Sequence, residues 1–181
     1  MKKTIFISAL MFTATFLLAQ KKITTSATIA FDASTILDNL PKAENKTVIA
    51  ALDTKTGVVQ FEASVKNFAF PNPTMQDHFN GERWMNSDQF PKFTFNGKID
   101  DLSKINFNKD GTYIVSVSGN LTIKDVSKSL TTTARAIIEG NILNVSSSFS
   151  IKLADYNLSG GSFDSGKVSK EPKISVTAEL K

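Results

Sequence analysis

Alternation of apolar and polar residues dominates the chain from Ile23 to its end. Successive side chains of a strand point to opposite faces of a sheet, so a period of two predicts strands with one buried and one solvated face. Eight segments are read as strands: 23–31, 48–52, 59–65, 93–99, 115–123, 130–138, 143–153 and 174–180. Most turns between them are short enough for antiparallel hairpins. The pattern therefore predicts an all-β domain of about eight antiparallel strands, either an up-and-down barrel or a sandwich.

Two segments favour short helices. Residues 34–39 could form a turn or two, with apolar side chains on one side. Asn72 followed by Pro73 is typical of a helix N-terminus, because Asn caps free backbone N–H groups and Pro fits the first helical turn. Met75 and Phe79 then lie four residues apart, on one face of the predicted helix.

The N-terminal residues read as a secretory signal peptide. Lys2 and Lys3 precede an apolar run, 5–18, that is about 14 residues long, and Ala19 offers a small residue for cleavage. That run is shorter than the roughly 20 residues that a membrane-spanning helix needs. We therefore expect residues 1–19 to be removed, leaving one domain, 20–181, in the periplasm or the external medium.

Charge and cysteine content narrow the classes of partner. The chain has 21 Lys and Arg residues, of which Lys2 and Lys3 lie in the predicted signal peptide, so 19 basic residues remain against 17 acidic ones. A net charge of +2 argues against nucleic acid as a partner. Scattered lysines indicate a solvated surface, with transient membrane contact as a lesser option and homodimer formation left open. The chain has no Cys, so no disulfide supports the fold.

Catalytic and metal chemistry find little support in the sequence. His78 is the only His, no Gly-x-Ser-x-Gly elbow accompanies it, and without Cys it could supply only one strong zinc ligand. Residues 161–167 have phosphate-loop spacing, but Val168 stands where a hydroxyl residue should hold magnesium. Residues 106–111 resemble the start of a calcium loop, but Val117 occupies the position of its bidentate Glu. We interpret the chain as a non-enzyme without a cofactor, and an esterase-like activity using His78 is the weaker alternative.

Three segments resemble the YceI-like family of exported bacterial proteins. The first combines Met75-x-x-His78-Phe79 with Phe90-Pro91-x-Phe93-x-Phe95. The second is Val117-Ser118-Gly119-Asn120-Leu121-Thr122-Ile123, and the third is Phe149-Ser150-Ile151-Lys152-Leu153-x-Asp155-Tyr156. The hairpin residues Lys124-Asp125 depart from the family, whose members commonly have His-Gly there. The resemblance implies a lipocalin-like antiparallel barrel that holds a long isoprenoid or other lipid in an internal tunnel.

A tunnel in such a barrel would need space between its inward side chains. About eight strands leave room for side chains or for one small ligand, and the inward positions mix small residues with phenylalanines. The segment 75–85 would then form a lid over one barrel mouth, with His78, Arg83 or Lys92 facing a polar or phosphate head group. The alternative is a structural or stress-response module in which the same aromatic residues pack a solid interior. The predicted ligand-binding residues are Phe61, Met75, His78, Phe79, Trp84, Met85, Phe93, Phe95, Val117, Phe149 and Ile151.

Overall fold

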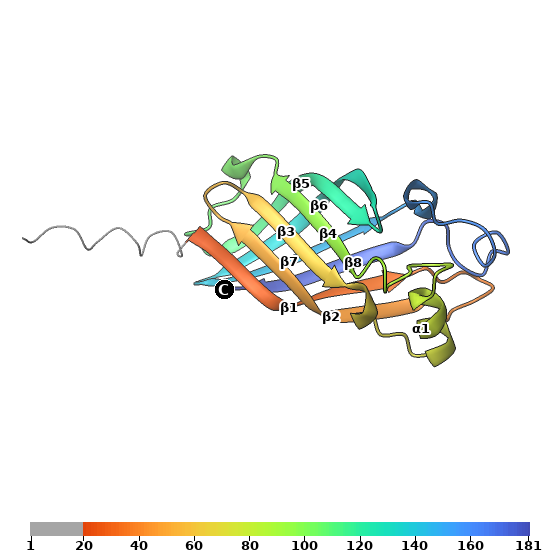
Figure 1. The fold of residues 1–181 in the computed structure, drawn as a ribbon. Helices are drawn as coiled ribbons and strands as arrows, with labels where there is room; N and C mark the ends of the chain where they lie inside the picture. The colour runs from red at the N-terminus through yellow and green to blue at the C-terminus, as the bar shows by residue number, and fades with distance from the viewer. Residues whose placement is uncertain (1–19) are drawn as a thin grey trace, which may run out of the picture.

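The computed structural model describes residues 20–181, which form a closed barrel of eight antiparallel strands in sequence order (Figure 1). The barrel closes because β1 pairs with both β2 and β8. Of the two predicted architectures, barrel and sandwich, the barrel is therefore correct. The predicted signal peptide lies outside the described residues. The strands are β1 (Lys21–Asp32), β2 (Lys42–Asp53), β3 (Val58–Ser64), β4 (Lys92–Ile99), β5 (Gly111–Ile123), β6 (Val126–Glu139), β7 (Ile142–Ser150) and β8 (Lys173–Leu180).

The strand β2 begins six residues before its predicted start at Val48. The cause is Asn45, a fully buried polar residue at an inward position, which interrupts the apolar period. Its side-chain amide donates to the carbonyl of Ser64 (2.9 Å), and its side-chain oxygen accepts from the backbone N–H of Thr47 (2.9 Å). A buried polar side chain with its hydrogen bonds made is compatible with a strand interior.

The helix predicted after Asn72 is confirmed as α1 (Pro73–Asn80), and the Asn72 side chain accepts from the backbone N–H of Met75 (3.1 Å). The helix predicted over 34–39 is wrong, because this segment is an irregular loop. There the N–H of Thr35 donates to the carbonyl of Asp38, three residues further along the chain. A helical N–H donates to a carbonyl four residues earlier in the chain, so this hydrogen bond is incompatible with a helix.

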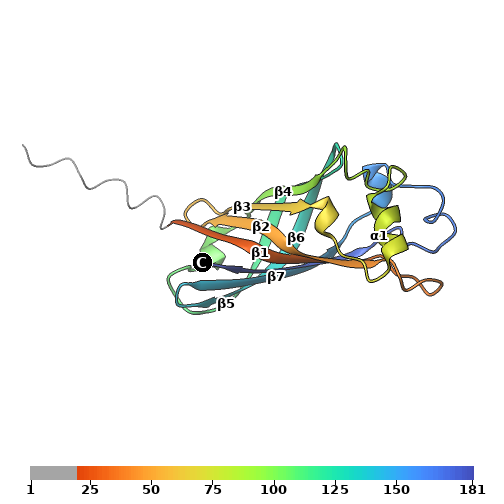
Figure 2. The same cartoon turned by 60° about the horizontal axis from the view of Figure 1, so that its bottom comes forward.

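The two ends of the barrel are built differently (Figures 1 and 2). The α1 end carries long connections, 33–41, 65–91 and 151–172, with the 3-10 turns η2 (Val65–Asn67) and η4 (Leu153–Tyr156). The terminus end, where Gln20 and Lys181 lie, carries the connections 54–57, 100–110 and 140–141, of which the second contains the 3-10 turn η3 (Leu102–Lys104). The strand predicted over 143–153 ends at Ser150, because the chain turns into η4. Within residues 20–181, no helix has the length and hydropathy to span a membrane.

Candidate functional site

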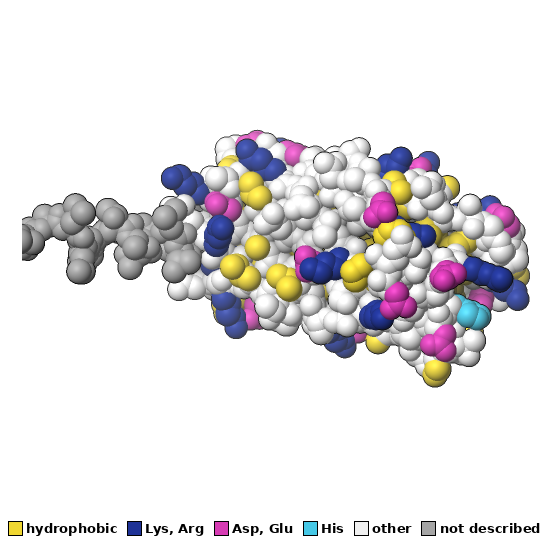
Figure 3. Space-filling view, in the orientation of Figure 1, with side chains coloured by type: hydrophobic (Ala, Val, Ile, Leu, Met, Phe, Trp, Pro, Cys, Tyr) yellow, Lys and Arg dark blue, Asp and Glu magenta, His cyan; other side chains and the backbone are white. Residues whose placement is uncertain are grey.

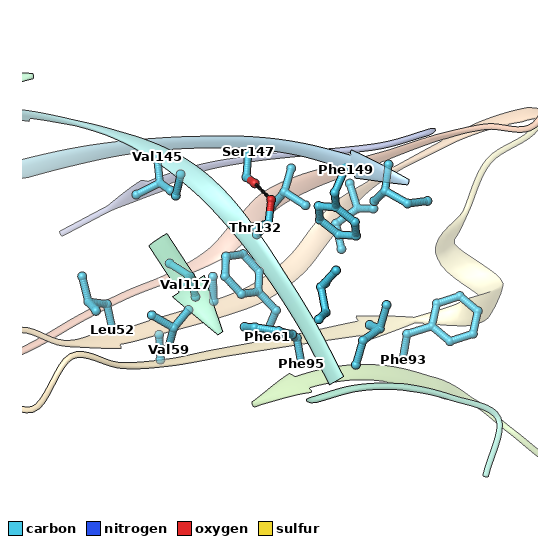
Figure 4. Close-up of a pocket in the computed structure, with 18 of the residues that line it drawn as sticks. Leu52, Val59, Phe61, Phe93, Phe95, Val117, Thr132, Val145, Ser147 and Phe149 are labelled. Carbon is cyan, nitrogen blue, oxygen red and sulfur yellow. Dashed lines mark hydrogen bonds between the residues drawn. The ribbon is translucent and has the colours of Figure 1, made fainter. Parts of the chain in front are cut away.

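An apolar cavity of about 170 Å³ runs inside the barrel (Figure 4). That volume far exceeds the roughly 10–15 Å³ that one water molecule needs, so the interior is hollow rather than imperfectly packed. All eight strands contribute to the lining, and the lining on β7 and its continuation reaches from Leu143 to Leu153. At about 3.3 Å per residue, that stretch covers roughly 30 Å of chain, so the space is elongated.

Paired glycines shape one wall of the cavity. Gly97 on β4 lies opposite Gly119 on β5, and the ring of Phe95 lies over both. A Cβ atom on Gly97 would come within 2.5 Å of Phe95 Cζ, and one on Gly119 within 2.7 Å of the same atom. The absence of side chains at both positions therefore lets a large ring lie flat against the wall, which keeps it out of the centre of the barrel.

In the part of the chain that the structure describes, the only hydroxyl groups in the cavity lining belong to Thr132 on β6 and Ser147 on β7. Their oxygen atoms lie 2.9 Å apart, and Ser147 also donates to the carbonyl of Thr133 (2.9 Å). The pair lies where β6 and β7 separate, because residues 126–133 of β6 pair with β5 alone. Figure 4 shows β6 diverging from β7 beyond this pair.

Among residues 20–181, no titratable side chain lines the cavity. Nor do the residues from Gln20 onward contain a group of three or more His, Cys, Asp or Glu side chains that could hold a metal ion. Buried charge is costly without a partner, so an apolar space of this kind favours apolar ligand atoms. The interior is suited to binding and lacks groups for acid–base chemistry.

A cluster of packed aromatic rings closes the cavity at the α1 end. Phe79 lies at its centre, with ring centroids 4.9 Å from Phe70, 5.3 Å from Trp84 and 5.9 Å from Phe68. Aromatic rings at such separations in tilted or edge-to-face arrangements attract one another beyond the effect of burial alone. The cluster comprises Phe31, Phe68, Phe70, Phe79, Trp84, Phe93 and Phe163.

The predicted site residues separate into two groups in the structure. Eight of them line the cavity: Phe61, Phe79, Met85, Phe93, Phe95, Val117, Phe149 and Ile151. Three do not. Trp84 is buried behind Phe79 in the aromatic cluster, Met75 is half-buried against the core, and His78 is exposed to solvent. The predicted lid thus contributes two side chains to the cavity and uses the rest of its aromatic surface to close the barrel.

Sequence reasoning missed several lining residues. Val145, Ile174 and Val176 occupy inward positions, so the strand alternation could have identified them. Phe68 belongs to the connection between β3 and α1, where no regular period indicates which side chains face the barrel. Strand alternation identifies Ser147 as a small inward residue, whereas Thr132 is missed because its polarity interrupts the apolar pattern of its strand.

Comparisons with known proteins agree with this architecture. A polyisoprenoid-binding domain from Saccharophagus degradans, implicated in plant cell wall breakdown, aligns with a TM-score of 0.75 at 14% identity, covering 90% of this chain and 98% of that domain. Burkholderia cenocepacia BcnA aligns with a TM-score of 0.70 at 18% identity, covering 86% of this chain and 96% of that protein. A Campylobacter jejuni YceI protein aligns with a TM-score of 0.53 at 15% identity, covering 100% and 94% of the two chains. At these identities the likenesses establish the fold alone.

Comparisons of the sequence with protein families and with curated proteins give different results. No curated protein matches the sequence significantly. The sequence pattern of the YceI-like domain matches residues 10–180, nearly the whole chain. This protein therefore belongs to the YceI-like domain family.

Proposed function

We propose that this protein binds one long-chain isoprenoid or a similar lipid inside the barrel and carries or sequesters it without covalent chemistry. The observation that supports this most is the elongated apolar cavity, with lining side chains from all eight strands. The structural likeness to a domain described as polyisoprenoid-binding is consistent with it.

The energetics favour a ligand with a long apolar tail. Each methylene group moved from water into an apolar site contributes about 0.8 kcal/mol, so a tail can bind tightly without polar contacts. Ser147 donates its proton to the carbonyl of Thr133 and Thr132 donates to Ser147, so the two hydroxyls keep only acceptor lone pairs for a ligand. We expect the shape and length of the tail to set selectivity, with any polar head group at a barrel end.

Two alternatives receive less support. A structural module with a packed interior should have no cavity of this size beneath Phe93 and Phe95. An esterase-like enzyme would need His78 near a nucleophile, yet this side chain is exposed and makes no hydrogen bond within the described residues. The lipid-binding proposal uses the hollow interior, which neither alternative requires.

Native mass spectrometry of protein purified from its own cells tests the proposal. We expect an adduct of a few hundred daltons or more, which is released on unfolding. A bare protein that also fails to take up added geranylgeraniol would contradict the proposal.

Matched variants locate the bound molecule. Val117→Phe with Val145→Phe adds two large side chains to the cavity wall and should abolish uptake of geranylgeraniol. Thr133→Phe with Ser146→Phe places the same side chains at exposed positions and should retain it. Equal uptake by the two double variants would place the ligand outside the barrel.

Export to the periplasm or the medium is part of the proposal. It is supported by the charged and apolar pattern of residues 1–19. Intact-mass analysis of the protein from its own cells should give a chain that begins at or near Gln20. A chain that retains Met1 would contradict cleavage.

A further inference from the structure

The loop 33–41 at the α1 end carries an unusual amount of exposed apolar surface. Ile36 is fully exposed (102%), Leu37 is 68% exposed and Leu40 is 50% exposed. Single exposed apolar residues are common on protein surfaces, but three within five positions of one loop form a contiguous group. Both ribbon views show the loop projecting from the α1 end (Figures 1 and 2).

The tip of this loop has much of its own backbone hydrogen bonding satisfied. The N–H of Thr35 donates to the carbonyl of Asp38 (2.7 Å), and the Thr35 hydroxyl accepts the N–H groups of Leu37 (3.1 Å) and Asp38 (3.2 Å). The Asp38 carboxylate accepts the N–H of Leu40 (2.8 Å). Polar backbone groups that are already paired lower the cost of moving a segment into an apolar environment.

The base of the loop is anchored to the barrel. Ala33 is fully buried, its N–H donates to the carbonyl of Pro41 (2.9 Å), and its carbonyl accepts the N–H of Ser169 (2.8 Å). The apolar tip is therefore presented in a fixed position, and its exposure is a property of the folded protein. A fixed tip loses little conformational entropy when it binds.

Two lysines without ion pairs lie beside the loop. A Cβ atom on Gly166 would lie 3.5 Å from Leu37 Cδ1, so the backbone leading into Lys167 approaches the apolar group. Lys173 pairs in register with Asp32 at the base of the loop. Both lysines are exposed, and neither forms an ion pair within residues 20–181. One carboxylate, that of Asp38, lies within the tip and accepts the N–H of Leu40. The lysines can contact the anionic head groups of a bilayer while the Asp38 carboxylate stays bonded to the loop backbone.

We propose that the loop 33–41 docks the protein on a lipid membrane, with Ile36, Leu37 and Leu40 inserted among the lipids. The inference rests on the proposed function, because an isoprenoid insoluble in water has to be collected from, or delivered to, a membrane. A projecting tip of three side chains is too small for a specific protein interface, which usually buries more than about 1,000 Å². A bilayer accepts such a tip without a complementary surface.

The absence of Cys allows a direct test with a single dye. Ile36→Cys and Ile114→Cys place an environment-sensitive fluorophore at the loop tip and at an exposed apolar site on β5, which is 56% exposed in the unmodified protein. With vesicles of phosphatidylcholine and phosphatidylglycerol in a 3:1 ratio, we expect a blue shift at position 36 and none at position 114. No shift at either position, or equal shifts at both, would overturn the proposal.

A triple variant tests the contribution of the side chains. Ile36→Ser, Leu37→Ser and Leu40→Ser together should lower the vesicle partition coefficient about tenfold or more, because each apolar side chain contributes to insertion. Ile49→Ser with Ile114→Ser, on the barrel wall, should leave it within about twofold. Unchanged partitioning of the triple variant, or a change in self-association alone, would overturn membrane docking.

Uptake of geranylgeraniol from solution separates this inference from the proposed function. The triple variant should load the cavity as well as the unmodified protein, because none of the three residues lines it. Failure of the unmodified protein to load would contradict isoprenoid binding and leave the vesicle result to decide on docking.

Discussion

The two ends of the barrel are covered by different structures. At the α1 end, long connections bring an aromatic cluster centred on Phe79 over the opening. At the terminus end, the connection 100–110, which contains η3, places the buried Ile105 and the half-buried Phe107 at the edge of the cavity. Loops on a rigid scaffold commonly carry function, so under the proposed function we expect ligand exchange at the α1 end.

Aromatic side chains at the α1 end and in the middle of the barrel differ in what they contact. Aromatic side chains packed against one another at the α1 end contribute mainly to the stability of the fold. Aromatic side chains such as Phe61 and Phe95, which face the cavity in the middle of the barrel, retain surface for a ligand. Substitutions that match positions at the two ends can test this reading.

The largest expected effect is at the centre of the aromatic cluster. Phe79→Ala removes a ring that is only 1% exposed and leaves a cavity, so it should lower the free energy of unfolding by about 3–5 kcal/mol. Phe107→Ala at the terminus end should cost about half of that or less, because its ring is only partly buried. Chemical denaturation measures both, and equal losses would remove the distinction between the ends.

Substitutions of polar residues should also lower the free energy of unfolding more at the α1 end than at the terminus end, with smaller losses at both. Asn45→Ala leaves the carbonyl of Ser64 and the N–H of Thr47 without partners in a buried place, so we expect a loss of about 2 kcal/mol. At the terminus end, Asp53 accepts the N–H groups of Lys55 and Thr56 in an exposed turn. Water can replace the Asp53 carboxylate there, so Asp53→Ala should lower the free energy of unfolding much less than Asn45→Ala in the same denaturation assay. A larger loss of unfolding free energy for Asp53→Ala than for Asn45→Ala would contradict the expected difference between the two ends.

Two hairpin turns offer a third comparison. Lys124 at the α1 end has φ of 54°, and Gly140 at the terminus end has φ of 58°. Lys124 also donates to the carbonyl of Trp84 (3.3 Å) and lies over the ring of Phe90 (5.3 Å). Gly140→Lys should therefore cost about 1 kcal/mol, because it introduces left-handed strain without such contacts.

The reverse exchange is the control for these turns. Lys124→Gly relieves backbone strain while it removes contacts with the lid, so we expect the free energy of unfolding to change by less than about 0.5 kcal/mol. A loss well above that value would show that the contacts of Lys124 outweigh its strain.

The smallest expected effect is a loss of stability of the folded protein at low pH. Burial raises the pKa of Asp32, but hydrogen bonds from Ser34 and the nearby Lys42 outweigh it, so the net pKa lies below the ordinary 3.8. The pKa of Asp53 is also lowered, chiefly by the backbone N–H of Thr56. A lowered pKa in the folded state stabilises the fold above the unfolded pKa, and this stabilisation is lost as the pH falls through the folded pKa.

Thermal unfolding between pH 5 and pH 2 checks this. We expect the midpoint temperature of unfolding to decrease once the pH drops below about 4. Asp32→Asn and Asp53→Asn should each make that decrease slightly smaller. A midpoint that rises as the pH falls would contradict the direction of both shifts.

The candidate site was predictable only in part. Phe61, Phe93, Phe95 and Phe149 follow strand alternation, which places them inside any closed sheet. Trp84 and Phe79 lie five residues apart in a connection without regular period, so sequence alone could not tell which of them faces the cavity. The ring of Phe79 faces it while Trp84 packs behind, because α1 and the following turns fix their order in space.

The sequence by itself determined the eight strands, the antiparallel order and the N-terminus of α1, because alternation and capping act between residues close in the chain. The tertiary structure alone decided that the interior is hollow at its centre and closed by packed rings at the α1 end. Those features depend on contacts across strands, such as the ring of Phe95 over Gly97 and Gly119, and on the separation of β6 from β7 beyond Ser147. Free volume is set by the closure and register of the whole sheet, which no local pattern specifies.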